Sequence, residues 1–175
     1  MEAAAPGSVY WITGLPGVGK STLARRLTHQ FTAIGQAVVR LDGDQLRPII
    51  GARYGFGLTD RRAMGMIYAR LCAELSGQGL QVICATESML AEVRAWNREH
   101  IAAYVEIYLR ASPDMLAGRA PRGVIAAAKA GRMRNVLGVD LPFEEPASPD
   151  LVIEDDGRRS ADEIAVEVLS WLADR

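Results

Sequence analysis

The sequence predicts a three-layer α/β domain in which a parallel sheet of about five strands carries helices on both faces. Short apolar segments alternate along the chain with longer segments of helical periodicity. Several of the apolar segments are continuously hydrophobic and rich in Val, Ile or Tyr, as in strands buried on both faces. Alternating strands and helices favour a parallel sheet covered by helices. The length of 175 residues fits one domain spanning residues 1–175.

The elements follow one another in a regular order. The strands are expected at 9–13, 37–41, 80–86, 104–109 and 151–153. Helices are expected at 20–34, which ends at Gly35, at 60–75, and at 89–100 after Ser88. Ser112 before Pro113 predicts the start of a further helix. Ser160 and Glu163 predict a capping box at the start of the last helix.

Charge and composition exclude several classes of protein. The 20 basic and 21 acidic side chains nearly cancel, whereas a protein that binds nucleic acid through many phosphate contacts carries a basic excess. The N-terminal residues lack the features of a signal peptide, and no uncharged run reaches the roughly 18 residues of a membrane span. We therefore expect a cytoplasmic protein that binds neither nucleic acid nor membrane. Cys72 and Cys84 lie in apolar runs and are expected to be buried free thiols.

A phosphate-binding loop is the strongest motif in the chain. Residues 14–21 match the pattern G-x-x-x-x-G-K-[ST] between an apolar strand and an amphipathic helix. Its glycines allow backbone N–H groups to point at phosphate oxygens, and the helix presents its positive end to the same anion. The motif predicts a P-loop NTPase fold with ATP and Mg²⁺ as ligands, Lys20 on the β- and γ-phosphates and Ser21 on the metal. The residues expected to bind the nucleotide are Gly14, Leu15, Pro16, Gly17, Val18, Gly19, Lys20, Ser21 and Thr22.

The rest of the chain separates a kinase from the other P-loop classes. A GTPase needs an N-K-x-D motif, but Asn97 is followed by Arg and Asn135 by Val. An ATPase motor usually carries an acid at the end of an apolar strand. Here the acid, Glu87, comes one residue late and is a weak candidate metal neighbour. The sequence therefore favours a small-molecule kinase, and a nucleotide-binding module that has lost its chemistry stays as the alternative.

Two carboxylates follow the second expected strand. Asp42 and Asp44 stand two residues apart, so in an extended segment they would share a face. Because the carboxyl ends of parallel strands meet at one edge, we expect Asp42 beside the phosphate loop. Asp42 and Asp44 are candidate catalytic residues, since a carboxylate here would take the proton of an acceptor hydroxyl, and such help is worth about 10²–10⁴ in rate. Asp42 is also a candidate magnesium partner together with Ser21.

A cationic lid is expected at approximately 118–140. This stretch is rich in Gly, Ala and Arg, and its basic residues precede its first acid, Asp140. A mobile cationic segment closes over a polyanion and excludes water, whereas a solvated surface helix is the other interpretation. The basic residues are Arg119, Arg122, Lys129, Arg132 and Arg134.

These motifs together resemble the adenylylsulfate kinases, which phosphorylate the ribose 3′-hydroxyl of adenosine 5′-phosphosulfate with MgATP. The resemblance covers nearly the whole chain and rests on the phosphate loop, the Leu-Asp-Gly-Asp-x-x-Arg block at 41–47, Gly55-Phe56 before Asp60-Arg61, and the run 138–146. It implies that Arg47 and Arg61 contact the phosphosulfate or ribose of the acceptor and that Phe56 stacks on its base. It also implies that Asp42 is the base or magnesium partner. Dimers are common in this family, so a homodimer is compatible with the resemblance.

The acceptor side departs from the family pattern. Met64 stands where the family usually has Asn, Met66 where an Arg pair begins, and Val136 where a second aromatic usually completes a sandwich on adenine. One stacked aromatic is worth about 1–3 kcal/mol. We therefore expect these three residues to line a more apolar and more open acceptor pocket. The acceptor is either a nucleotide such as adenosine 5′-phosphosulfate or another small molecule, nucleotide-linked or an intermediate of sugar, capsule or natural-product chemistry.

Overall fold

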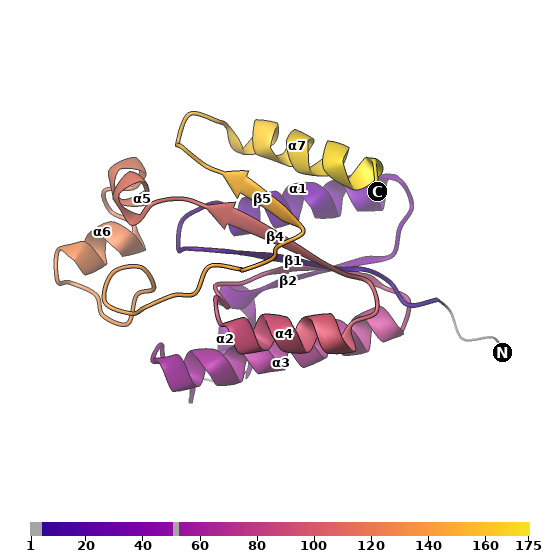
Figure 1. Ribbon diagram of the computed structural model, residues 1–175, viewed down its shortest axis with the longest axis horizontal. Helices are drawn as coiled ribbons and strands as arrows, with labels where there is room; N and C mark the ends of the chain where they lie inside the picture. The colour runs from indigo at the N-terminus through magenta and orange to yellow at the C-terminus, as the bar shows by residue number, and fades with distance from the viewer. Residues whose placement is uncertain (1–4, 51–52) are drawn as a thin grey trace.

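The computed structural model describes residues 5–50 and 53–175, and its strands form one five-stranded parallel sheet (Figure 1). The strands are β1 (Val9–Gly14), β2 (Val38–Asp42), β3 (Gln81–Ala85), β4 (Tyr104–Arg110) and β5 (Leu151–Glu154). They lie in the order β2-β3-β1-β4-β5, so β1 pairs with β3 on one side and with β4 on the other. The predicted strands are confirmed, and their ends differ from the prediction by a residue at most.

Helices cover both faces of the sheet. α1 (Lys20–Ala33) and α7 (Ala161–Ala173) pack together on one face, and α3 (Leu58–Gly77) and α4 (Ala91–His100) pack together on the other (Figure 1). α5 (Pro113–Arg119) and α6 (Val124–Lys129) lie beyond the carboxyl ends of the strands, and α2 (Gly43–Ile50) directly follows β2. Within the two described stretches, no helix is long and apolar enough to span a bilayer.

The two faces of the sheet bury separate hydrophobic clusters. Neighbouring residues of β1 point to opposite faces, so Ile12 joins the cluster under α1 and α7 while Trp11 joins the cluster under α3 and α4. Cys72 and Cys84 are free and buried in the second cluster, as expected. The strands are therefore covered on both sides, which explains their continuously apolar sequences.

Two of the predicted helix caps are confirmed and one is wrong. The Ser112 hydroxyl accepts the N–H of Met115 at α5, and Ser160 and Glu163 form the predicted capping box at α7. α4 begins at Ala91 rather than at Met89, and the Ser88 side chain does not cap it. A carboxylate from far along the chain takes that place, because Glu144 accepts the N–H of Ala91 at 2.9 Å.

The lid has an apolar underside that the sequence pattern does not reveal. Ile125, Ala128, Val136 and Leu137 are buried in the same cluster as Leu15 of the phosphate loop. The segment after α6 turns at Asn135, which adopts a left-handed φ of 62°. The carboxylate of Asp140 accepts the N–H groups of Asn135 and Val136 at 2.7 Å each. The lid is therefore packed onto the domain as well as charged on its outside.

Candidate active site

The phosphate loop joins β1 to α1 at the carboxyl edge of the sheet. Gly17 and Gly19 adopt positive φ angles of 80° and 104°, which glycine tolerates without strain. The side chains of Leu15 and Val18 are each 2% exposed and anchor the loop in the core. Part of the loop and the start of α1 line a cavity of about 300 Å³, which we call the phosphate-loop cavity. Its loop members are Gly17, Gly19, Lys20, Ser21 and Thr22.

Lys20 is a buried cation at this cavity, with 8% of its surface exposed. Its ammonium donates hydrogen bonds to the carbonyls of Gly14 at 3.0 Å and Leu15 at 2.9 Å. Burial lowers the pKa of Lys20, and the negative charges of Glu87, Asp44 and Asp42 oppose that shift. Lys20 is thus a fixed charge among carboxylates, at the place where the loop would hold phosphate.

The end of β2 differs from the extended segment that the sequence led us to expect. The chain enters α2 at Gly43, so Asp42 is the last strand residue and Asp44 lies in the first turn of the helix. Asp42 accepts the N–H of Asp44 at 3.1 Å, as an N-cap residue does. β3 separates β2 from β1, yet both carboxylates line the phosphate-loop cavity. The expected grouping is therefore present, but a helix start produces it.

Asp44 differs from Asp42 in its electrostatic surroundings. Partial burial raises the pKa of Asp44, and the charges of Glu87 and Asp42 raise it further. Asp42 is only 8% exposed and uses one oxygen as a cap, whereas Asp44 is exposed. Of the two, Asp44 is the more accessible carboxylate.

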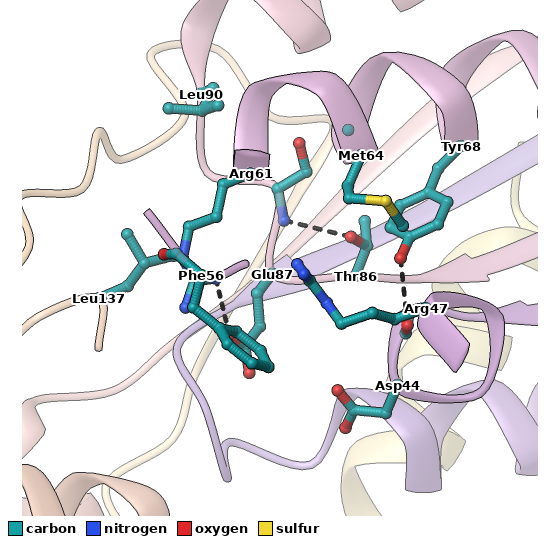
Figure 2. Close-up of a pocket in the computed structure, with 13 residues that line it drawn as sticks. Asp44, Arg47, Phe56, Arg61, Met64, Tyr68, Thr86, Glu87, Leu90 and Leu137 are labelled. Atoms are coloured by element: carbon teal, nitrogen blue, oxygen red, sulfur yellow. Dashed lines mark hydrogen bonds and ion pairs between the residues drawn. The ribbon is translucent and has the colours of Figure 1, made fainter. Parts of the chain in front are cut away.

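A second opening adjoins the phosphate-loop cavity. We call it the Arg47–Arg61 cleft, and it encloses about 40 Å³ (Figure 2). It shares Gly43, Asp44, Thr86 and Glu87 with the phosphate-loop cavity. Asp44 and Glu87 therefore stand at the border between the two spaces.

Arg47 and Phe56 form one side of this cleft. The Arg47 guanidinium lies 4.3 Å from the centroid of the Phe56 ring and donates to the carbonyl of Tyr54 at 3.1 Å. The Phe56 side chain is 53% exposed, so half of it is open to a ligand. The structure places both residues at the cleft, and their role in acceptor binding stays a prediction.

Arg61 connects three separate segments. Its guanidinium donates to the carbonyl of Phe56 at 2.9 Å, to Glu87 at 3.2 Å and to the carbonyl of Asn135 at 2.9 Å. It thereby joins the loop before α3, the segment after β3 and the lid. The Arg61 side chain is only 10% exposed, so it serves the protein's own structure as well as the cleft.

Tyr68 is a cleft residue that the sequence reasoning missed. It is 4% exposed, and its hydroxyl donates to the carbonyl of Gly43 at 3.1 Å (Figure 2). Desolvation by burial raises the pKa of Tyr68 to about 12, so the hydroxyl stays a donor at neutral pH. Arg61, Met64 and Tyr68 are spaced by three and four residues, as on one helix face. This spacing is the sequence signal that places Tyr68 on the same side of the helix as Arg61.

The expected apolar lining is only partly present. Met64 lines the Arg47–Arg61 cleft and is 1% exposed. Met66 instead packs against the cluster under α3 and α4, and Val136 is 2% exposed in the cluster on the opposite face. Leu137 lines the cleft in place of Val136. Both residues are 2% exposed in the same cluster, and of the two only Leu137 borders the cleft.

Two of the five lid cations contact other residues of the protein, and the other three are exposed on its surface. Arg119 donates to the carbonyl of Gly17 in the phosphate loop at 2.7 Å and to Asp155 at 2.6 Å. Lys129 pairs with Asp114. The others are exposed on the surface of the lid: Arg122, Arg132 and Arg134. The lid thus touches the phosphate loop through Arg119 and the Arg47–Arg61 cleft through Asn135.

The oxygen atoms at the phosphate-loop cavity suit a hard cation. Ser21, Asp42, Asp44 and Glu87 all line it. Over residues 5–50 and 53–175, no group of three His, Cys, Asp or Glu side chains could hold a metal by itself. Mg²⁺ usually takes one or two carboxylates and fills its shell with water and substrate phosphates. The donor set therefore fits magnesium bound together with a nucleotide.

The fold and these two adjoining spaces define a P-loop kinase. The family model for adenylylsulphate kinase matches residues 6–154. The chain therefore belongs to the adenylylsulphate kinase family, whose members are ATP-dependent phosphotransferases acting on a hydroxyl group.

Curated relatives of comparable length carry two different names. The chain is 34% identical to the adenylyl-sulfate kinase of Vibrio cholerae over 96% of this chain and 79% of the relative. It is 39% identical to the adenylyl-sulfate kinase of Paraburkholderia xenovorans over 88% of this chain and 87% of the relative. It is also 33% identical to the cytidine diphosphoramidate kinase of Campylobacter jejuni over 94% of this chain and 96% of the relative. Membership of the family therefore does not fix the acceptor.

Solved structures agree with the fold. The APS kinase of Mycobacterium tuberculosis in complex with AMPPNP and APS has a TM-score of 0.84 and 33% identity, covering 96% of this chain and 98% of that chain. A gluconokinase from Sinorhizobium meliloti has a TM-score of 0.66 at 19% identity, covering 97% of this chain and 93% of that chain. The second likeness shows the shared fold of P-loop kinases.

Proposed function

We propose that this protein transfers the γ-phosphoryl group of ATP to a hydroxyl of a nucleotide-like acceptor, with Mg²⁺ as cofactor. The observation that carries the proposal is the shared border of the two spaces. The phosphate-loop cavity and the Arg47–Arg61 cleft have Asp44 and Glu87 in common. A donor phosphate in the first space and an acceptor hydroxyl in the second would meet at this border, beside Asp44.

The donor side uses the phosphate loop. Backbone N–H groups of the loop and the start of α1 would bind the phosphate oxygens, and the ammonium of Lys20 would balance their charge. Ser21 and Asp42 would hold Mg²⁺, which neutralises charge on the β- and γ-phosphates when bound. An ATP-consuming reaction of this kind also agrees with the cytoplasmic location expected from the sequence.

Asp44 is the proposed general base. The acceptor oxygen forms a bond to the γ-phosphorus, its proton passes to the Asp44 carboxylate, and the bond from that phosphorus to the bridging oxygen breaks to release ADP. Asp44 is preferred over Asp42 for two reasons. It lies at the border of both spaces, and Asp42 has one oxygen committed to the N–H of Asp44.

The acceptor side supports a nucleotide with a second anionic group. Arg47 and Arg61 bring two cations to the cleft, and Phe56 brings an exposed aromatic face. Adenosine 5′-phosphosulfate and cytidine diphosphoramidate, the molecules that the relatives' names indicate, share a nucleoside, a 5′-phosphate and a small terminal group. We propose an acceptor of this class.

The test is direct measurement of phosphoryl transfer. Purified protein with MgATP is supplied separately with adenosine 5′-phosphosulfate and cytidine diphosphoramidate, and the product is followed by phosphorus NMR. Saturable, magnesium-dependent transfer to at least one of them supports the proposal. ATP binding without transfer to either would favour a nucleotide-binding module.

Two variants separate the proposed roles of the aspartates. Asp44→Asn should lower kcat by about 10²-fold or more with an unchanged magnesium requirement. Asp42→Asn keeps a capping oxygen, so it should fold normally and raise the magnesium concentration needed for half-maximal rate. The reverse pattern would exchange the two assignments.

A further inference from the structure

Glu87 places a negative charge in the space proposed for the acceptor. The Arg47–Arg61 cleft contains two arginines and two carboxylates, Asp44 and Glu87, so its formal charges cancel. Figure 2 shows Glu87 in the same cleft as Arg47, Phe56 and Arg61. The Glu87 side chain is 27% exposed, so a ligand can reach it. Besides pairing with Arg61, this carboxylate presents a hydrogen-bond acceptor to a ligand in the cleft.

The ion pair fixes where Glu87 would meet an acceptor. Arg61 and Glu87 are 3.2 Å apart. Arg61 has five N–H groups, and its three nitrogen atoms already donate to Phe56, Glu87 and Asn135. An acceptor anion can use only the remaining N–H groups of the same guanidinium. An anion bound by the free N–H group of the nitrogen that also donates to Glu87 would lie beside that carboxylate.

This arrangement distinguishes between terminal groups. A carboxylate only accepts hydrogen bonds. A sulfate also presents only acceptor oxygens, so it would face Glu87 with repulsion and no hydrogen bond. A terminal amide of phosphorus has oxygens for Arg61 and N–H groups for Glu87. Specificity of this kind combines an attractive contact for one ligand with a repulsive contact for another.

We infer that Glu87 is a specificity-determining residue that makes the cleft favour acceptors whose anionic end carries an N–H donor over acceptors that end in sulfate. The inference rests on the proposed function, because it assumes that the acceptor's anionic end lies at Arg61. It goes further by naming the chemistry of that end.

The test uses acceptors that differ only in the terminal group. The probes are adenosine 5′-phosphosulfate and the matching adenosine 5′-diphosphoramidate, with MgATP, and kcat/KM is measured for each. The wild-type protein should prefer the amide. In Glu87→Gln the ratio of the two kcat/KM values should shift toward the sulfate by about tenfold, the size expected from one hydrogen bond to a charged group. If the substitution only disturbed the lid or the position of Arg61, kcat/KM would fall for both acceptors and the ratio of the two values would stay unchanged.

A matched control removes a similar ion pair elsewhere. Glu92 pairs with Arg62 between α4 and α3, outside the two spaces of the active site. Glu92→Gln should keep the wild-type ratio. A wild-type preference for the sulfate, or an unchanged ratio in Glu87→Gln, overturns the inference.

The failure of the proposed function can be told apart from the failure of this inference. If the wild-type protein phosphorylates neither of these probes nor cytidine diphosphoramidate, the proposed function is wrong. The inference is then decided by calorimetric binding of the same two probes in the presence of a nonhydrolysable ATP analogue. Tighter binding of the amide that Glu87→Gln reverses would support it, and equal binding or no binding would overturn it.

Discussion

The Tyr68 hydroxyl donates a hydrogen bond to the carbonyl of Gly43 at 3.1 Å, so α3 directly supports the turn that lies between Asp42 and Asp44. The contact is buried, since Tyr68 is 4% exposed. It comes from a residue that no phosphate-loop motif includes, and it holds the start of α2 against the wall of the Arg47–Arg61 cleft.

Tyr68→Phe should reduce kcat several-fold and leave the KM for ATP nearly unchanged. The ring stays in place, while the loss of one hydrogen bond worth about 0.5–1.5 kcal/mol loosens the position of Asp44. Tyr104→Phe is the control, because that hydroxyl contacts Asn97 at 3.4 Å in the cluster under α3 and α4. Equal losses of kcat in both variants would contradict a specific role for Tyr68.

Arg119→Ala should destabilise the protein by about 1–3 kcal/mol, because it leaves the carboxylate of Asp155 without its ion pair. Asp155 is 5% exposed. The Arg119 side chain is 35% exposed, so solvent screens the ion pair and we expect a loss of about 1 kcal/mol rather than about 3 kcal/mol. Urea denaturation measures it. Arg122→Ala, a change at an exposed lid residue, should have little effect on stability, and Asp155→Asn added to Arg119→Ala should recover part of the loss. No recovery would mean that the ion pair is not the cause.

Asp140 makes part of the lid's stability depend on pH. Backbone N–H groups of Val136 and Asn135 lower the pKa of Asp140 below its ordinary value of 3.8. A lowered pKa in the folded state stabilises the protein above the ordinary pKa, and this contribution is lost as the pH falls through the lowered value. Wild type and Asp140→Asn should therefore differ in urea midpoint at neutral pH and converge in acid. A constant difference at every pH would show that the charge of Asp140 is not involved.

Lys20→Ala should lower kcat/KM by about 10²–10³, as expected when one charged donor to a transferring group is removed. Lys20→Arg should not restore the rate, because a planar guanidinium replaces a compact ammonium that is held by the carbonyls of Gly14 and Leu15. Steady-state kinetics with varied ATP measures both variants. Arg26→Ala, on the exposed side of α1, is the control. A rate for Lys20→Arg near that of the wild type would contradict the proposed fit.

Features encoded by neighbouring residues were predictable from the sequence. The strands, the phosphate loop, and the caps at Ser112 and Ser160 each depend on a few consecutive residues, and the structure confirms them. The start of α2 was not predicted, because two aspartates two residues apart also fit the end of an extended strand. Asp42 in fact caps the helix.

Features that depend on distant residues were not predictable in the same way. Arg61 and the Asn135 carbonyl are 74 residues apart in the chain, and Ala91 and Glu144 are 53 apart. Leu137 rather than Val136 lines the cleft, two residues after the left-handed backbone turn at Asn135. No periodicity marks such a turn, so a one-residue error in the lining residue is the expected kind of mistake.

The two attachments of the lid have a thermodynamic consequence. One end of the lid contacts the phosphate loop through Arg119, and the other contacts Arg61 through Asn135. A nucleotide that shifts the lid would therefore also shift a wall of the cleft proposed for the acceptor. Linkage requires that the factor by which ATP changes acceptor affinity equals the factor by which the acceptor changes ATP affinity. A binding experiment with either molecule alone would underestimate or overestimate its affinity in the ternary complex by that single shared factor.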